Sequence, residues 1–160
     1  MTRAEIALNY FNEGYACSQA VVLAFKDLVN ISEEELSKIS IPFGGGLGRL
    51  RLTCGALSGM AMIIGLLFSK DENTNDNKMN VYAIIQKLSE KFIEVNGSLN
   101  CEELLKLAQV EVEKKGKPEE RTFQYYNKRP CGKIVYKAAN ILEEYLIEEN
   151  VIKEWWVIEF

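Results

Sequence analysis

The chain contains no histidine, and this absence excludes several kinds of site at once. Cysteine–histidine catalytic pairs, zinc sites with imidazole ligands and haem held by histidine all require that side chain. The sequence also lacks any uninterrupted apolar run of about 18 residues, the length that marks a membrane-spanning helix. Residues 1–5 carry charges where a secretory signal would be apolar. We therefore expect a cytoplasmic protein without a membrane span.

Basic residues are not gathered on one face anywhere in the sequence. The chain has 19 lysine and arginine residues against 23 aspartate and glutamate residues, for a net charge of −4. This balance argues against nucleic acid as a partner. With 160 residues, of which 48% are apolar, the chain can close one hydrophobic core but not two. We expect one domain that covers residues 1–160.

Apolar residues recur at helical spacing through most of the chain, which predicts an all-α fold. We expect an irregular bundle of about six helices, in which a glycine-rich loop leads into a central helix. The patterns cover residues 3–12, 16–28, 54–68, 78–97, 100–108 and a last long helix from residue 131, with a short helix before Pro42. About a dozen residues before Pro130 are expected to be a connection, where Tyr125 and Tyr126 are candidates to line a pocket.

Residues 43–52, here called the glycine loop, have the sequence FGGGLGRLRL. The candidate binding residues of the loop are Gly44, Gly45, Gly46, Gly48, Arg49 and Arg51. Thr53 follows and is a suitable N-cap for the next helix. Glycines let the backbone approach closely and present successive N–H groups to a sulfur or to a bound anion. The loop matches neither common nucleotide-binding glycine motif, so a module that binds a small anion or a nucleotide is kept as a rival function.

Each of the four cysteines falls within the first turn of a different predicted helix. They are Cys17, Cys54, Cys101 and Cys131. One return segment separates successive cysteine helices, so all four helices can begin at the same end of the bundle. Helix N-termini carry partial positive charge, and a cysteine there can have its pKa lowered from about 8.5 to between roughly 3.5 and 7.5. We expect the four sulfurs to face inward as thiolates, with Arg49 and Arg51 favouring the same form.

Four cysteines without an export signal point to a reducing compartment, in which structural disulfides are rare. Metal binding and thiol chemistry are then the leading functions for the four cysteines. In the first, the four cysteines are metal ligands that hold zinc or an iron–sulfur cluster, of which the two-iron type suits four ligands best. In the second, they are catalytic thiols, two of which exchange electrons through a disulfide. A purely structural zinc site and plain core packing are the other interpretations.

The residues around the first two cysteines resemble a family of bacterial and archaeal proteins named for a C, GCAxxG, C, C pattern. Cys17 takes the first place, and the glycine loop leads to Cys54-Gly55-Ala56-Leu57-Ser58-Gly59, which is similar to the central motif. Cys101 and Cys131 take the last two places. Thr53 stands before the second cysteine and Gly55 after it, so the order here is CGAxxG. The resemblance spans nearly the whole chain and implies redox activity, with the four cysteines, Gly55 and Gly59 as motif positions. Gly55 and Gly59 are candidate cofactor-binding residues, together with those of the glycine loop.

Electron transfer implies a redox partner, which the sequence does not identify. Trp155, Trp156 and Phe160 stand at the end of the sequence. These aromatic side chains either cover an interface in a homodimer or fold back on their own domain.

Overall fold

The computed structural model describes residues 1–153, and within that range the fold is all-α, as predicted. The helices are α1 (Arg3–Asn12), α2 (Cys17–Leu23), α3 (Glu33–Ser40), α4 (Gly55–Phe68), α5 (Asn75–Asn96), α6 (Cys101–Leu107), α7 (Phe123–Lys128) and α8 (Cys131–Glu148). Two short 3₁₀ turns, Lys26–Leu28 and Ile41–Phe43, follow α2 and α3. The candidate interface residues Trp155, Trp156 and Phe160 lie outside the described residues.

The described chain has eight α-helices where about six were expected, and α7 is the clearest addition. It lies in the segment that was expected to be a connection. The Thr122 side chain caps it by accepting a hydrogen bond from the Tyr125 N–H group at 3.2 Å. None of its six residues is buried, so the helix has no apolar stripe from which it could have been predicted.

Helix α2 lies at the centre of the bundle and packs against α1, α3, α4 and α8. Its residues from Ala20 to Leu23 are fully buried. Gly59 makes the close contact with α4 possible, because a Cβ at that position would lie 2.8 Å from the Ser18 carbonyl oxygen. Gly55, one helical turn earlier on the same face, would place a Cβ 2.5 Å from Cys17 Sγ. The two motif glycines therefore let α4 lie directly against α2.

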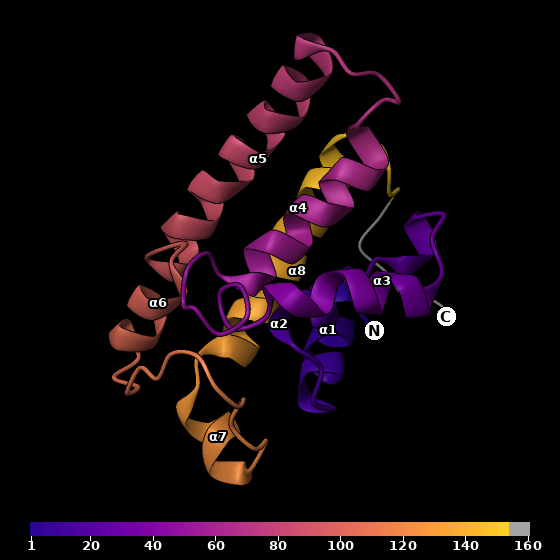
Figure 1. The fold of residues 1–160 in the computed structure, drawn as a ribbon. Coiled ribbons are helices and arrows are strands. Elements are labelled where there is room, and N and C mark those ends of the chain that lie inside the picture. Colours follow the sequence, from indigo (N-terminus) through magenta and orange to yellow (C-terminus); the bar gives the residue numbers. More distant parts are fainter. Residues whose placement is uncertain (154–160) are drawn as a thin grey trace.

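The longest helices run along one another on one side of α2. Helices α4 and α8 are in contact, and α5 packs against both through Leu88 and Phe92 (Figure 1). Helix α7 projects beyond the end of the bundle at which α8 begins (Figure 1). No helix among residues 1–153 has the length and apolar character needed to cross a membrane.

Candidate functional site

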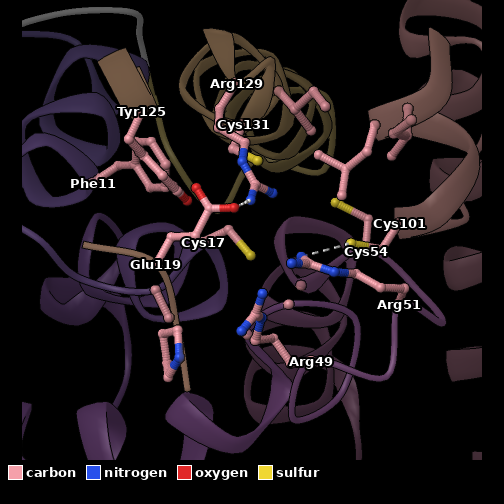
Figure 2. Close-up of a pocket in the computed structure, with 18 of the residues that line it drawn as sticks. Phe11, Cys17, Arg49, Arg51, Cys54, Cys101, Glu119, Tyr125, Arg129 and Cys131 are labelled. Carbon is pink, nitrogen blue, oxygen red and sulfur yellow. Dashed lines mark hydrogen bonds and ion pairs between the residues drawn. The ribbon is translucent and has the colours of Figure 1, made fainter. Parts of the chain in front are cut away.

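All four cysteines stand at helix starts. Cys17, Cys101 and Cys131 are the first residues of α2, α6 and α8, and Cys54 is the N-cap residue of α4. The four side chains line one cavity of about 500 Å³, and Figure 2 shows them around it. None of the four is in a disulfide. The structure therefore brings together the cysteines that lie far apart in the sequence.

Backbone pairing joins the second and third cysteine segments. The Cys54 N–H group donates to the Leu99 carbonyl at 2.8 Å, and the Cys101 N–H group donates to the Leu52 carbonyl at 2.6 Å. Thr53 lies between these contacts and forms an isolated antiparallel bridge with Asn100. The expectation that Thr53 caps α4 is therefore wrong, because its backbone pairs with the segment before α6 and Cys54 takes the cap position.

The glycine loop coils in the left-handed backbone region. Residues 45–49 all have φ between +54° and +71°, and Arg51 has φ of +60°. Leu47, Arg49 and Arg51 are the strained positions, since each non-glycine residue in this region costs on the order of 1 kcal/mol or more. The coil is closed by the Arg51 N–H group, which donates to the Gly45 carbonyl at 3.0 Å. This conformation lets the Gly45 N–H group donate a hydrogen bond to Cys17.

Gly44, Gly45, Gly48 and Gly55 line the cavity, whereas two other motif glycines do not. At Gly46 a Cβ would lie 2.6 Å from the Leu52 nitrogen and 2.7 Å from Cys101 Cβ. Gly46 therefore lets the loop close against α6, as Gly59 lets α4 approach α2. These two glycines act through packing at positions where the sequence suggested contact with a cofactor.

Arg49 and Arg51 fasten the glycine loop to the segment after α6. Arg51 Nε donates to the Glu113 carbonyl at 2.8 Å, and its Nη1 lies 3.8 Å from Cys101 Sγ. Arg49 donates to the Lys117 carbonyl and lies 3.4 Å from the Glu113 carboxylate. Only Arg51 thus contacts a sulfur, and most of the hydrogen bonds of both side chains hold chain segments together.

A second group of cavity residues comes from α7 and its flanks, and sequence reasoning missed most of it. Arg121 donates to the Phe11 and Tyr15 carbonyls, both at 3.0 Å. Tyr125 lies between two guanidinium groups, with Arg121 4.8 Å and Arg129 5.0 Å from its ring centre. Arg121 and Arg129 lie four residues before and after this tyrosine, but both stand outside α7, so the spacing is not a helical pattern that could have indicated the group. Tyr125 lines the cavity, as suggested, but Tyr126 does not.

Positive charge predominates around the cavity. Four arginines line it, namely Arg49, Arg51, Arg121 and Arg129. Glu119 is the one carboxylate among the described lining residues, and it lies 2.6 Å from Arg129. Because arginine stays protonated in proteins, the surface of this cavity attracts anions.

The thiols of the cavity are harder to ionise than the sequence suggested. Burial raises the pKa of Cys131 to about 12 and that of Cys54 well above its usual value. Burial also raises the pKa of Cys17, against the opposing effect of the Gly45 N–H group. The expectation of lowered pKa values is therefore wrong for these three residues, because loss of solvent outweighs the helix N-termini and the nearby arginines.

The four sulfurs are too far apart in this structure to bind one metal ion together. Within residues 1–153, no three cysteine, aspartate or glutamate side chains are grouped closely enough to hold a single metal ion. The cysteines nevertheless influence one another, since Cys17 raises the pKa of both Cys54 and Cys131. The four side chains thus surround the cavity instead of converging on one point.

The comparisons with known proteins give a family but no activity. The family described as "Putative redox-active protein (C_GCAxxG_C_C)" matches residues 15–145. A protein of Archaeoglobus fulgidus, described as "Uncharacterized protein", is 32% identical over 146 residues, which cover 84% of this chain and 87% of that protein. No solved structure matches the chain.

Proposed function

Because this chain belongs to the C_GCAxxG_C_C family, whose description names redox activity, we propose that it is an electron-transfer protein with an iron–sulfur cluster in the cavity. Cys17, Cys54, Cys101 and Cys131 would be the ligands of a cluster of the two-iron type. The observation that carries the proposal is that four cysteines from four separate helix starts line one cavity. The cluster would supply one-electron transfer, and the protein would supply the ligands, the hydrogen bonds and the exclusion of water.

The charge of the cavity supports an anionic centre. An iron–sulfur core held by four thiolates carries a net negative charge, which is costly to bury without compensation. The four lining arginines exceed the one lining carboxylate among the described residues. They therefore offset the negative charge of such a centre and would also stabilise its reduced form.

Hydrogen bonds to the sulfurs support the same proposal. The backbone N–H groups of Gly45 and Ala56 donate to Cys17 and Cys54, and the Arg51 guanidinium donates to Cys101. Hydrogen bonds of this kind help to set the reduction potential of iron–sulfur clusters. The glycine loop would thus tune the centre as well as shape the cavity.

The raised thiol pKa values favour ligation over exchange with outside disulfides. Cys17, Cys54 and Cys131 stay protonated at neutral pH and are then weak nucleophiles. Metal ligation replaces the thiol protons and supplies the positive charge that the buried thiolates need. A single zinc ion is supported less well, because the described residues form no group able to hold one ion.

The test is the content of iron, acid-labile sulfide and zinc in protein purified without oxygen and, separately, after reconstitution with iron and sulfide. We expect iron and sulfide in near-equal amounts in the wild-type protein and a loss of both in each of the four Cys→Ser variants. Ser58→Ala, which changes a side chain next to the motif glycine but not a cysteine, is the control and should retain both. Wild-type protein that stays free of iron after reconstitution would contradict the proposal.

Thiol exchange is the second candidate, and the contact between Arg51 and Cys101 favours it. Cys101 is the one cysteine to which a side-chain cation donates a hydrogen bond, and such charge-assisted contacts are stronger than neutral ones. If the protein proves free of metal, we expect Cys101 to be alkylated first. Equal alkylation rates for all four cysteines would remove the support for this candidate.

A further inference from the structure

The side of the cavity opposite the glycine loop holds an arginine whose hydrogen-bonding capacity is only partly used. The Arg129 side chain is 4% exposed, and its Nη2 donates to Glu119 Oε1 at 2.6 Å. Its Nε and Nη1 have no hydrogen-bond partner among residues 1–153. Neither nitrogen is among the buried side-chain nitrogens without a partner, and Arg129 lines the cavity, so both donors are available to a ligand there.

Glu119 reaches the cavity with a side chain that is more exposed than that of Arg129. It is 41% exposed and lies on the connection between α6 and α7. Arg129, in contrast, is fixed at the junction of α7 and α8, where its own N–H group donates to the Tyr125 carbonyl at 3.0 Å. The carboxylate can therefore leave the arginine by rotation of one half-exposed side chain, whereas the arginine cannot leave the cavity.

Tyr125 adds a neutral donor beside the same arginine. Burial raises its pKa to about 12, so the hydroxyl group keeps its proton at neutral pH. The hydroxyl has no hydrogen-bond partner within the described part of the chain, and the residue lines the cavity. Figure 2 shows the side chains of Tyr125, Glu119 and Arg129 pointing toward one another.

We propose that Arg129 and Tyr125 form a binding site for the oxyanion group of a small molecule, a carboxylate or a phosphate, and that Glu119 occupies this site until the ligand displaces it. The carboxylate of Glu119 shows the chemistry that the site accepts. Arg129 lowers the pKa of Cys131, and Cys131 raises the pKa of Tyr125, so a molecule bound between Arg129 and Tyr125 would lie within the electrostatic reach of that sulfur. This site deepens the proposed function by naming the class of molecule that meets the redox centre.

Arg129 is better placed to bind an anion than Arg49 and Arg51, the two arginines that the sequence suggested for this role. Arg49 and Arg51 donate mainly to backbone carbonyls of residues 113 and 117. Arg129 instead pairs with a side chain that can move. An anion entering the cavity would therefore bind Arg129 before it could replace the contacts of the other two arginines.

The test is isothermal titration calorimetry with sodium phosphate and sodium acetate at constant ionic strength. The wild-type protein is compared with Glu119→Gln and with Glu120→Gln, a matched control that removes the same charge from the neighbouring exposed residue. We expect Glu119→Gln to bind one of the two probes about tenfold more tightly than the wild type, since the competing carboxylate is gone. Glu120→Gln should stay within about twofold of the wild type, because an exposed charge contributes little.

Arg129→Gln in the Glu119→Gln background should abolish the gain, and Arg129→Lys should restore part of it, with circular dichroism as the check of folding. The probe that binds more tightly identifies the oxyanion group. Equal affinities of Glu119→Gln and Glu120→Gln, or no binding of either probe to Glu119→Gln, would overturn the proposal. Each titration is run on metal-free and on reconstituted protein, so failure of the cluster proposal and failure of the oxyanion site are seen separately.

Discussion

The two sides of the cavity differ in how much backbone pairing holds them. On one side, the glycine loop is closed by backbone hydrogen bonds and pairs with the segment before α6, and the Arg49 and Arg51 side chains add contacts to the segment after α6. On the other side, α7 and its flanks are held by side chains, with Arg121 on the Phe11 and Tyr15 carbonyls and Arg129 on Glu119. Backbone contacts fix Cys17, Cys54 and Cys101, whereas side-chain contacts place the charges near Cys131. The first side can set geometry, and the second can respond to a ligand.

The largest loss of stability should come from adding a methyl group to the glycine loop, on the side of the cavity that backbone contacts hold. Gly46→Ala places a Cβ 2.6 Å from the Leu52 nitrogen in a residue with φ of +71°. We expect the free energy of unfolding to fall by about 3 kcal/mol, because backbone must move to relieve the overlap. Gly48→Ala is the matched variant, since its φ is also positive but nothing lies within 4 Å of the new Cβ.

Gly48→Ala should cost only about 1 kcal/mol, which is the conformational strain alone. Urea unfolding of both variants measures the difference. Equal losses would mean that the loop can shift freely and that backbone contacts do not fix this side of the cavity.

Loss of one side-chain contact should loosen α7 and its flanks without unfolding the rest of the protein. Arg121→Ala removes two hydrogen bonds to carbonyls of residues 11 and 15 and the contact over the Phe11 ring at 4.4 Å. We expect a loss of about 2 kcal/mol. Amide hydrogen exchange should become faster in residues 119–129 and stay unchanged in residues 44–54. Faster exchange in both segments would show that the two sides are one cooperative unit.

The pH dependence of stability should reveal the raised pKa of the Cys131 thiol, which lies on the α7 side of the cavity. The folded protein holds the pKa of Cys131 at about 12, whereas an unfolded chain ionises this thiol near pH 9. The folded state therefore keeps a proton that the unfolded state releases, and the stabilisation present below pH 9 is lost as the pH rises toward 12. Between pH 7 and pH 10, metal-free wild-type protein should lose about 1 kcal/mol more stability than Cys131→Ser. Identical losses in urea unfolding would contradict the buried, protonated thiol.

The smallest expected effect is a gain in stability. Leu47 is half-exposed and has φ of +70°, so Leu47→Gly should remove strain and raise the free energy of unfolding by about 0.5 kcal/mol. Leu50 is exposed to a similar degree but does not have a positive φ, and Leu50→Gly should destabilise the protein. The two urea midpoints should therefore move in opposite directions. A shift in the same direction would mean that Leu47 stabilises the loop by packing.

The sequence predicted the features that depend on local pattern. Helical spacing and capping residues placed each cysteine at a helix start, as the structure confirms. The pairing of Thr53 with Asn100 could not be predicted, because the two residues lie 47 positions apart and share no local pattern. The thiol pKa values were misjudged for a related reason. A helix N-terminus is visible in sequence, but the burial that opposes it arises only from tertiary packing.

The sequence indicated the four cysteines of the candidate site but not most of the charged residues around them. Cys17 and Cys54 could be selected because cysteines are few and stand in motif positions. Arg121 and Arg129 could not, because surface and buried arginines look alike in sequence and their partners, such as the Phe11 carbonyl, lie far along the chain. Their role depends on how α7 folds across the end of the bundle.

If the four cysteines around the cavity ligate one redox centre, electron paramagnetic resonance should detect it. Spectra are recorded on protein purified without oxygen, before and after reduction with dithionite. We expect no signal in the oxidised wild-type protein, a reduced two-iron cluster signal after dithionite, and loss of that signal in every Cys→Ser variant. A silent spectrum in reduced, iron-reconstituted protein, or a signal that survives in the variants, would contradict the proposal.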